Sequence, residues 1–87
     1  MKNTKLENIL IQKGLTNREA EIAALVSTGL SDAEIANQLF ITSLTVKFHL
    51  KNSYKKTLWK SRAQLIVWCL PHCNYPEYIL SAQKGEK

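Results

Sequence analysis

A repeated pattern of helix caps constrains the fold of this chain more than any other feature. At four places a Ser or Thr is followed three residues later by Glu or Gln: Thr4 with Glu7, Thr16 with Glu19, Ser31 with Glu34, and Ser61 with Gln64. In such a capping box the hydroxyl accepts a hydrogen bond from an amide of the first helical turn, and the longer side chain accepts one from the capping residue's amide. Asn-Gly and Asp-Gly hairpin turns do not occur, so the pattern predicts an all-α fold.

The predicted helices follow from these starts and from two further residues. Thr42 can cap a fifth helix, although Thr45 stands where the acid or amide would be. Gly29 suits the left-handed position that closes a helix. We therefore expect helices near residues 4–13, 17–28, 32–39, 43–57 and 62–70.

Length and composition favour one small intracellular domain. The 87 residues leave no room for a second domain. The longest uninterrupted apolar run, Leu65 to Leu70, is too short to span a membrane, and no secretory signal is visible. Cys69 and Cys73 are too few for a disulfide framework, so we expect both to remain reduced thiols.

The charge of the chain is concentrated in one segment. No carboxylate lies between Glu34 and Glu77, yet that segment carries half of the twelve basic residues. They are Lys47, Lys51, Lys55, Lys56, Lys60 and Arg62. An ordinary solvated surface would mix both signs, so this segment is expected to meet a polyanion, with nucleic acid as the leading partner.

The third and fourth predicted helices are joined by only three residues, Phe40 to Thr42. That length is typical of a helix-turn-helix corner, which puts the acid-free helix 43–57 in the recognition position. At about 100° per residue, one side of this helix carries Val46, Leu50, Ser53, Tyr54 and Thr57. The opposite side carries Leu44, Thr45, Phe48, Lys51, Asn52 and Lys55.

From Leu15 to Pro71 the chain resembles the LuxR/GerE-type helix-turn-helix domain. The motifs that carry the likeness are Leu15-Thr16 with Arg18-Glu19, Gly29-Leu30-Ser31, Glu34-Ile35-Ala36, Leu39-Phe40-Ile41, Thr45-Val46-Lys47 with His49, and Lys56 followed by Ser61-Arg62. The resemblance implies a small tetrahelical domain over 15–71, preceded by an N-terminal helical extension (1–14) and followed by a C-terminal extension (72–87). It also implies a homodimeric regulator of transcription that binds double-stranded DNA in the bacterial cytoplasm or nucleoid.

The resemblance assigns roles to individual residues. Lys47, Phe48 and Lys51 are expected to reach base edges in the major groove. Phosphate contacts are expected from Thr45, His49, Asn52, Lys55, Lys56, Lys60 and Arg62. Four alternatives stay open. Phe48 could be covered by a partner domain or a lysine stem, and Lys47 and Lys51 could be solvated charges of the helix. Arg62 could be structural, and His49 could be a boundary residue with a satisfied ring.

The chain departs from the family pattern at the end of the recognition helix. Ser53 and Thr57 replace large aliphatic residues, Leu58 replaces Gly, and Trp59 replaces Val. We expect Leu58 and Trp59 to refill the lost apolar space, and the corner before Ser61 to differ because Leu58 disfavours a left-handed helix end. These changes motivate an alternative hypothesis, an interaction protein that pairs with and inhibits a larger regulator of the same family.

The last predicted helix is apolar on two sides, so it must be covered on two sides. One stripe consists of Ala63, Ile66, Val67 and Leu70, and Leu65 and Trp68 lie on another side. We expect Leu65 and Trp68 to form the homodimer interface. The alternative is cover from the same chain, by the leading helix with Leu6, Ile9 and Leu10 or by the tail with Tyr75, Tyr78 and Ile79.

No enzyme, metal site or cofactor is predicted. The capping spacing explains Glu19 and Glu34, and no nucleophile, Gly-rich phosphate loop or carboxylate pair stands out. Cys69, His72 and Cys73 have ligand types that suit zinc but lack a fourth ligand.

Overall fold

The computed structural model describes residues 4–72, which form five α-helices and one short turn of 3₁₀ helix. The helices are α1 (Lys5–Gln12), α2 (Asn17–Ser27), α3 (Asp32–Leu39), α4 (Ser43–Lys56) and α5 (Arg62–Cys69), and the 3₁₀ turn is Leu70–His72. Within these residues there is no strand, and each helix begins and ends within one residue of its predicted bounds. The all-α prediction is confirmed. No helix in this part of the chain has the length and apolar character needed to cross a bilayer.

The helix caps form as predicted, with one exception. Thr4, Thr16 and Ser31 make complete capping boxes with Glu7, Glu19 and Glu34. In each box the hydroxyl accepts an amide hydrogen bond of 3.1–3.2 Å, and the glutamate accepts one of 2.8–2.9 Å. The Ser61 box is incomplete, because Gln64 accepts from the amide of Lys60 at 2.6 Å instead of from Ser61.

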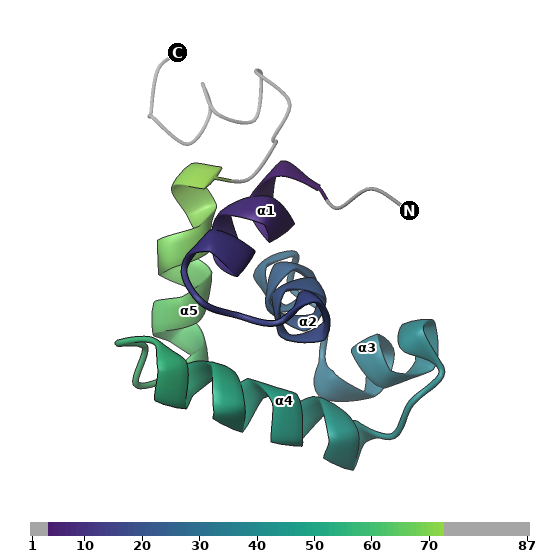
Figure 1. Ribbon diagram of the computed structural model, residues 1–87. Coiled ribbons are helices and arrows are strands. Elements are labelled where there is room, and N and C mark those ends of the chain that lie inside the picture. The colour runs from purple at the N-terminus through teal and green to yellow at the C-terminus, as the bar shows by residue number, and fades with distance from the viewer. Residues whose placement is uncertain (1–3, 73–87) are drawn as a thin grey trace.

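Helix α2 is the centre of the fold. Figure 1 views it nearly end-on, with α1 above it, α5 to the left, α4 below and α3 to the right. Each of the other helices turns a fully buried apolar side chain toward this centre: Leu10 from α1, Ile35 from α3, Val46 from α4 and Leu65 from α5. Burial of these side chains removes apolar surface from water, so one shared core holds the five helices together.

The burial of Leu65 corrects the predicted dimer interface. This side chain is 0% exposed within a single protomer, so it has no surface left for a second subunit. Trp68 is half-buried: its ring lies 5.5 Å from that of Trp59 and 4.7 Å from that of His72, and the Lys13 ammonium lies 5.0 Å from its centroid. The predicted interface is therefore wrong for Leu65, whereas Trp68 keeps part of its surface and its predicted contact stays a prediction.

Helix α1 supplies part of the cover that the intrachain alternative required. Leu6 and Leu10 are buried in the same core as Leu65, and Ile9 is half-buried. The tail residues Tyr75, Tyr78 and Ile79 lie outside the described residues. The α5 stripe of Ala63, Ile66, Val67 and Leu70 is divided: Ile66 is half-buried against the core, whereas Ala63, Val67 and Leu70 are exposed.

The unusual residues at the end of α4 are accommodated inside the chain. The Ser53 hydroxyl donates to the carbonyl of His49 at 2.9 Å, and the Thr57 hydroxyl donates to that of Ser53 at 3.0 Å. Trp59 is buried and fills core space as predicted, but Leu58 is exposed, so that part of the prediction is wrong. Thr57 ends the helix in an extended conformation, with φ −123°, as expected where no glycine is present.

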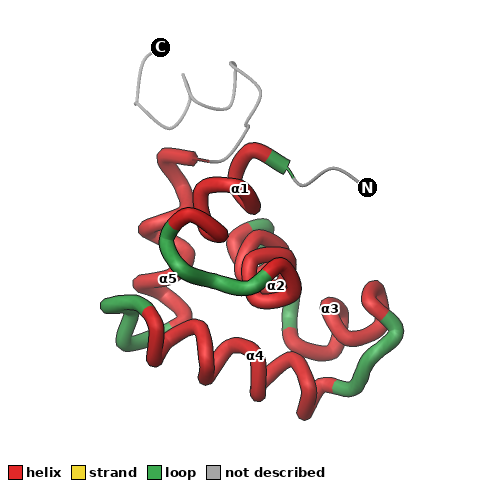
Figure 2. Tube along the Cα trace, in the orientation of Figure 1, coloured by secondary structure: helices red, strands yellow, loops and turns green. Residues whose placement is uncertain are grey.

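The corner between α3 and α4 contains a strained residue. Figure 2 shows this corner as the short green segment at the right. Phe40 closes α3 in the left-handed conformation, with φ 60° and ψ 42°, and its amide donates to the carbonyl of Ala36. Its side chain is 94% exposed, so little packing offsets the cost of this conformation for a residue with a Cβ atom.

Phe40→Gly should therefore raise the free energy of unfolding by about 0.5 to 1 kcal/mol, because glycine adopts a positive φ without strain. Denaturant unfolding would measure the change as a higher midpoint with an unchanged slope. Phe40→Ala is the control, since it removes the ring but keeps the strain. An equal gain in both variants would mean that the exposed ring, not the backbone, carries the cost.

Candidate nucleic-acid interface

Helix α4 has one buried side and one exposed side, as the sequence predicted. Val46, Leu50 and Ser53 are buried against the rest of the domain. On the opposite side Lys51 and Lys55 are exposed, as are Leu44 (76%) and Phe48 (60%). The first turn contains no acid, and the Thr42 hydroxyl caps it by accepting from the Thr45 amide at 3.1 Å.

Four of the six clustered basic residues offer their charge to solvent. They are Lys47, Lys51, Lys55 and Lys60, all exposed. No salt bridge found within residues 4–72 involves any of them. Three lie on α4 and Lys60 lies in the loop that follows it, so this helix and its loop present positive charge that no salt bridge within residues 4–72 compensates.

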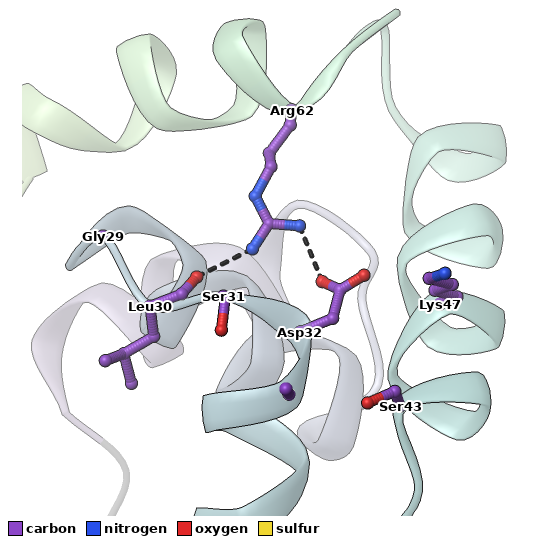
Figure 3. A pocket seen from close by; sticks show the side chains of 8 residues that line it. Gly29, Leu30, Ser31, Asp32, Ser43, Lys47 and Arg62 are labelled. Carbon is purple, nitrogen blue, oxygen red and sulfur yellow. Dashed lines mark hydrogen bonds and ion pairs between the residues drawn. The ribbon is translucent and has the colours of Figure 1, made fainter.

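Arg62 has a structural role. Its Nη1 lies 2.7 Å from Asp32 Oδ1, and its Nη2 donates to the Leu30 carbonyl at 2.7 Å. Figure 3 shows the guanidinium reaching from the start of α5 to the start of α3, where it borders an open hollow of about 540 Å³. These bonds hold two helix ends together, so the structure favours the structural alternative over a phosphate contact.

Lys47 also lines this hollow. Figure 3 places it on α4 with Ser43, facing the start of α3. A second, smaller hollow is lined by Lys47, Lys51 and Tyr54 together with Asp32 and Arg62. Lys47 is therefore at the α3 side of the exposed face, whereas Lys51 is closer to its middle.

Lys56 is also engaged within the chain. Its ammonium lies 2.7 Å from Glu19 Oε1, and the Glu19 side chain is only 5% exposed. Burial alone would raise the pKa of Glu19, but hydrogen bonds from Lys56 and from the amide and hydroxyl of Thr16 outweigh it and lower the pKa below its ordinary value. The predicted role of Lys56 as a phosphate contact is therefore replaced by a structural one.

The remaining predicted contacts lie at the edge of the exposed face. Thr45, His49 and Asn52 are half-buried. The Thr45 hydroxyl is 2.9 Å from that of Thr42, and the His49 ring meets the Phe48 ring edge-on, with centroids 5.7 Å apart. Their predicted phosphate contacts stay predictions.

Only two of the three possible zinc ligands, Cys69 and His72, lie among the described residues. Cys69 is buried and the His72 ring packs on Trp68, whereas Cys73 lies outside the described residues. Among residues 4–72 no group of three potential metal ligands comes together.

A short helix, a three-residue corner and an exposed, acid-free second helix define a helix-turn-helix domain. The chain belongs to the bacterial regulatory proteins of the luxR family, whose sequence profile matches residues 13–69. This match confirms the family resemblance. The family is one of regulatory proteins rather than enzymes.

Individual relatives agree with the family. The probable csgAB operon transcriptional regulatory protein of Salmonella typhimurium is 48% identical over 54 residues, covering 62% of this chain and 25% of that protein. The transcriptional regulatory protein LiaR of Bacillus subtilis is 42% identical over 62 residues, which cover 71% of this chain and 29% of the length of LiaR. The response regulator protein VraR of Staphylococcus saprophyticus is 35% identical over 72 residues, which cover 83% of this chain and 34% of the length of VraR. The matches thus span about a quarter to a third of these relatives, and no solved structure matches.

Proposed function

We propose that this protein binds double-stranded DNA sequence-specifically as a homodimer and regulates transcription in the bacterial cytoplasm or nucleoid. The observation that carries the proposal is the exposed, acid-free side of α4, with Lys47, Lys51 and Lys55 available to solvent. Duplex DNA is a dense polyanion, and its major groove admits an α-helix. The relatives that share this domain are transcriptional regulators by name, which supports the same conclusion.

The residues of α4 divide into two groups along its length. Lys47, Phe48 and Lys51 lie in the first turns, the part of a recognition helix that enters the groove most deeply, and we assign them to base edges. Lys55 lies later on α4 and Lys60 beyond its end, and both are assigned to phosphates, with Thr45, His49 and Asn52 at the edge of the same contact. Lys56 and Arg62 hold the domain together instead.

The proposed homodimer uses the outward side of α5. Ala63, Val67 and Leu70 follow the i, i+4, i+7 spacing of a single helix stripe, and all three are exposed. An exposed apolar stripe of this kind is suited to a two-fold contact with the same stripe of a second copy. Leu65 and Trp68 support this helix from within the protomer.

The alternative, an interaction protein that inhibits a larger regulator of the same family, has weaker support. This hypothesis was based on the unusual residues at the end of α4. Ser53 and Thr57 bond to their own helix, and Trp59 is buried, so these residues serve the fold of the single chain. Leu58 is the exception, because it is exposed.

DNA titrations on a selected duplex and a scrambled duplex, repeated across salt concentrations, test the proposed function. Lys51→Ala should weaken the free energy of binding to the selected duplex by about 1 to 3 kcal/mol, and it should reduce the preference for the selected over the scrambled duplex. Lys55→Ala should weaken both duplexes alike and lower the salt slope by about 1. If the unmodified protein binds no duplex at moderate salt, the interaction-protein alternative takes over.

A further inference from the structure

Two large apolar side chains occupy the middle of the α4 face that we assign to DNA. Leu44 is 76% exposed and Phe48 is 60% exposed, and they stand one helical turn apart. At about 100° per residue, both lie in the same stripe as Lys51 and Lys55, directly opposite the buried Val46 and Ser53. Because they are neighbours on one helix face, the two side chains form a contiguous exposed apolar patch, and a patch of this kind marks a surface that a specific partner covers.

The surroundings of this pair indicate the chemistry of the partner. Lys51 and Lys55 share the stripe, Lys47 borders it, and α4 carries no acid. A partner must therefore combine dense negative charge with small apolar groups. In the major groove of DNA the C5 methyl of thymine is an apolar group that lies between two rows of phosphates.

We propose that Leu44 and Phe48 read two thymine methyl groups in the preferred DNA site. The proposal rests on the proposed function and adds Leu44, which sequence reasoning did not assign, as a specificity-determining residue. It also assigns the Phe48 ring to a thymine methyl group, in place of the alternative that a partner domain or a lysine stem covers the ring.

The spacing of the two side chains predicts the spacing of the two methyl groups. Residues four apart on a helix are separated by a rise of about 6 Å. Base pairs are stacked about 3.4 Å apart along the duplex. If α4 follows the groove, its two apolar side chains match methyl groups about two base steps apart, so the preferred site carries thymines at that separation.

Deoxyuridine substitution tests this proposal, because it removes only the C5 methyl and keeps base pairing and charge. Each thymine of a duplex selected for tight binding is replaced in turn. For the unmodified protein, two replacements about two steps apart should each weaken binding by about fourfold, the effect of one buried methyl-sized group. Changing cytosine to 5-methylcytosine at either position, in a duplex that carries cytosine there, should recover most of that factor.

Protein variants assign each methyl to its side chain. Leu44→Ala should abolish the effect of deoxyuridine at one position only, and Phe48→Ala at the other only. Lys55→Ala is the matched control, since it should bind more weakly and remain sensitive at both positions. All three side chains are exposed, so unfolding midpoints should confirm that the variants stay folded.

Three outcomes would overturn the proposal. Selective binding that no deoxyuridine replacement alters would refute methyl recognition while leaving the proposed function intact. Full affinity of Leu44→Ala on every duplex would place Leu44 outside the groove. Binding to vesicles of anionic lipid that requires Leu44 and Phe48, with no deoxyuridine effect, would identify a membrane surface as the partner. Failure to bind any duplex would instead reject the proposed function on which the proposal rests.

Discussion

Leu10→Ala should lower the free energy of unfolding by about 2 to 5 kcal/mol, the usual cost of truncating a large buried side chain. Leu10 belongs to α1, is fully buried, and contacts the core that α2 and α5 share. A domain of this size has a total stability of roughly 5 to 10 kcal/mol. The variant should therefore unfold at a markedly lower temperature than the unmodified protein. Denaturant unfolding followed by circular dichroism measures the change.

Asn8→Ala provides the control for this experiment. Asn8 lies on the same helix but is exposed, so its substitution should change the stability by no more than about 0.5 kcal/mol. A Leu10→Ala loss as small as that of Asn8→Ala would mean that α1 is an appended helix and not part of the core. The family profile begins only at residue 13, so this result would decide whether the residues before it belong to the folding unit.

Lys56→Met should lower the free energy of unfolding by about 1 to 3 kcal/mol near neutral pH, because it leaves the buried Glu19 carboxylate without its ammonium partner. Methionine keeps most of the length and apolar stem of the lysine. Lys55→Met is the matched control: it removes the same charge from the adjacent residue, which is exposed and is not in the Glu19 ion pair. Equal losses in the two variants would contradict the structural role of Lys56.

The same pair predicts a pH dependence. In the folded protein the pKa of Glu19 is lowered from its ordinary value of 4.5, so the unfolded chain binds the proton more tightly. The stabilisation is therefore fully present above pH 4.5 and is lost as the pH falls through the lower folded pKa. The difference between the unmodified protein and Lys56→Met should be greatest near neutrality and shrink in acid. A difference that stays constant across an acid-to-neutral series of unfolding curves would rule out Glu19 as its source.

These contacts change how the positive charge of the chain is understood. The sequence places six basic residues in one acid-free segment, and all six were predicted to meet DNA. Lys56 and Arg62 instead pair with Glu19 and Asp32 in the folded domain. The proposed phosphate contact therefore depends on fewer cations, which predicts a smaller salt dependence of binding than the sequence count suggests.

The sequence by itself determined the helices, the corner and the family. Capping links residues only three positions apart, so Thr16 with Glu19 and Ser31 with Glu34 mark helix starts without knowledge of the rest of the fold. The two sides of α4 were predictable for the same reason, because helical periodicity is a local property. The motifs of the luxR family are likewise short segments of sequence.

The tertiary structure alone decided which of these helical faces are covered and which charges are paired. Lys56 and Glu19 are 37 positions apart, and Arg62 and Asp32 are 30 apart, so no local pattern indicates that they meet. The two apolar sides of α5 were visible in the sequence, but their directions were not. Leu65 faces inward and Val67 outward because α2 packs on one side of α5, and only the assembled core determines which side that is.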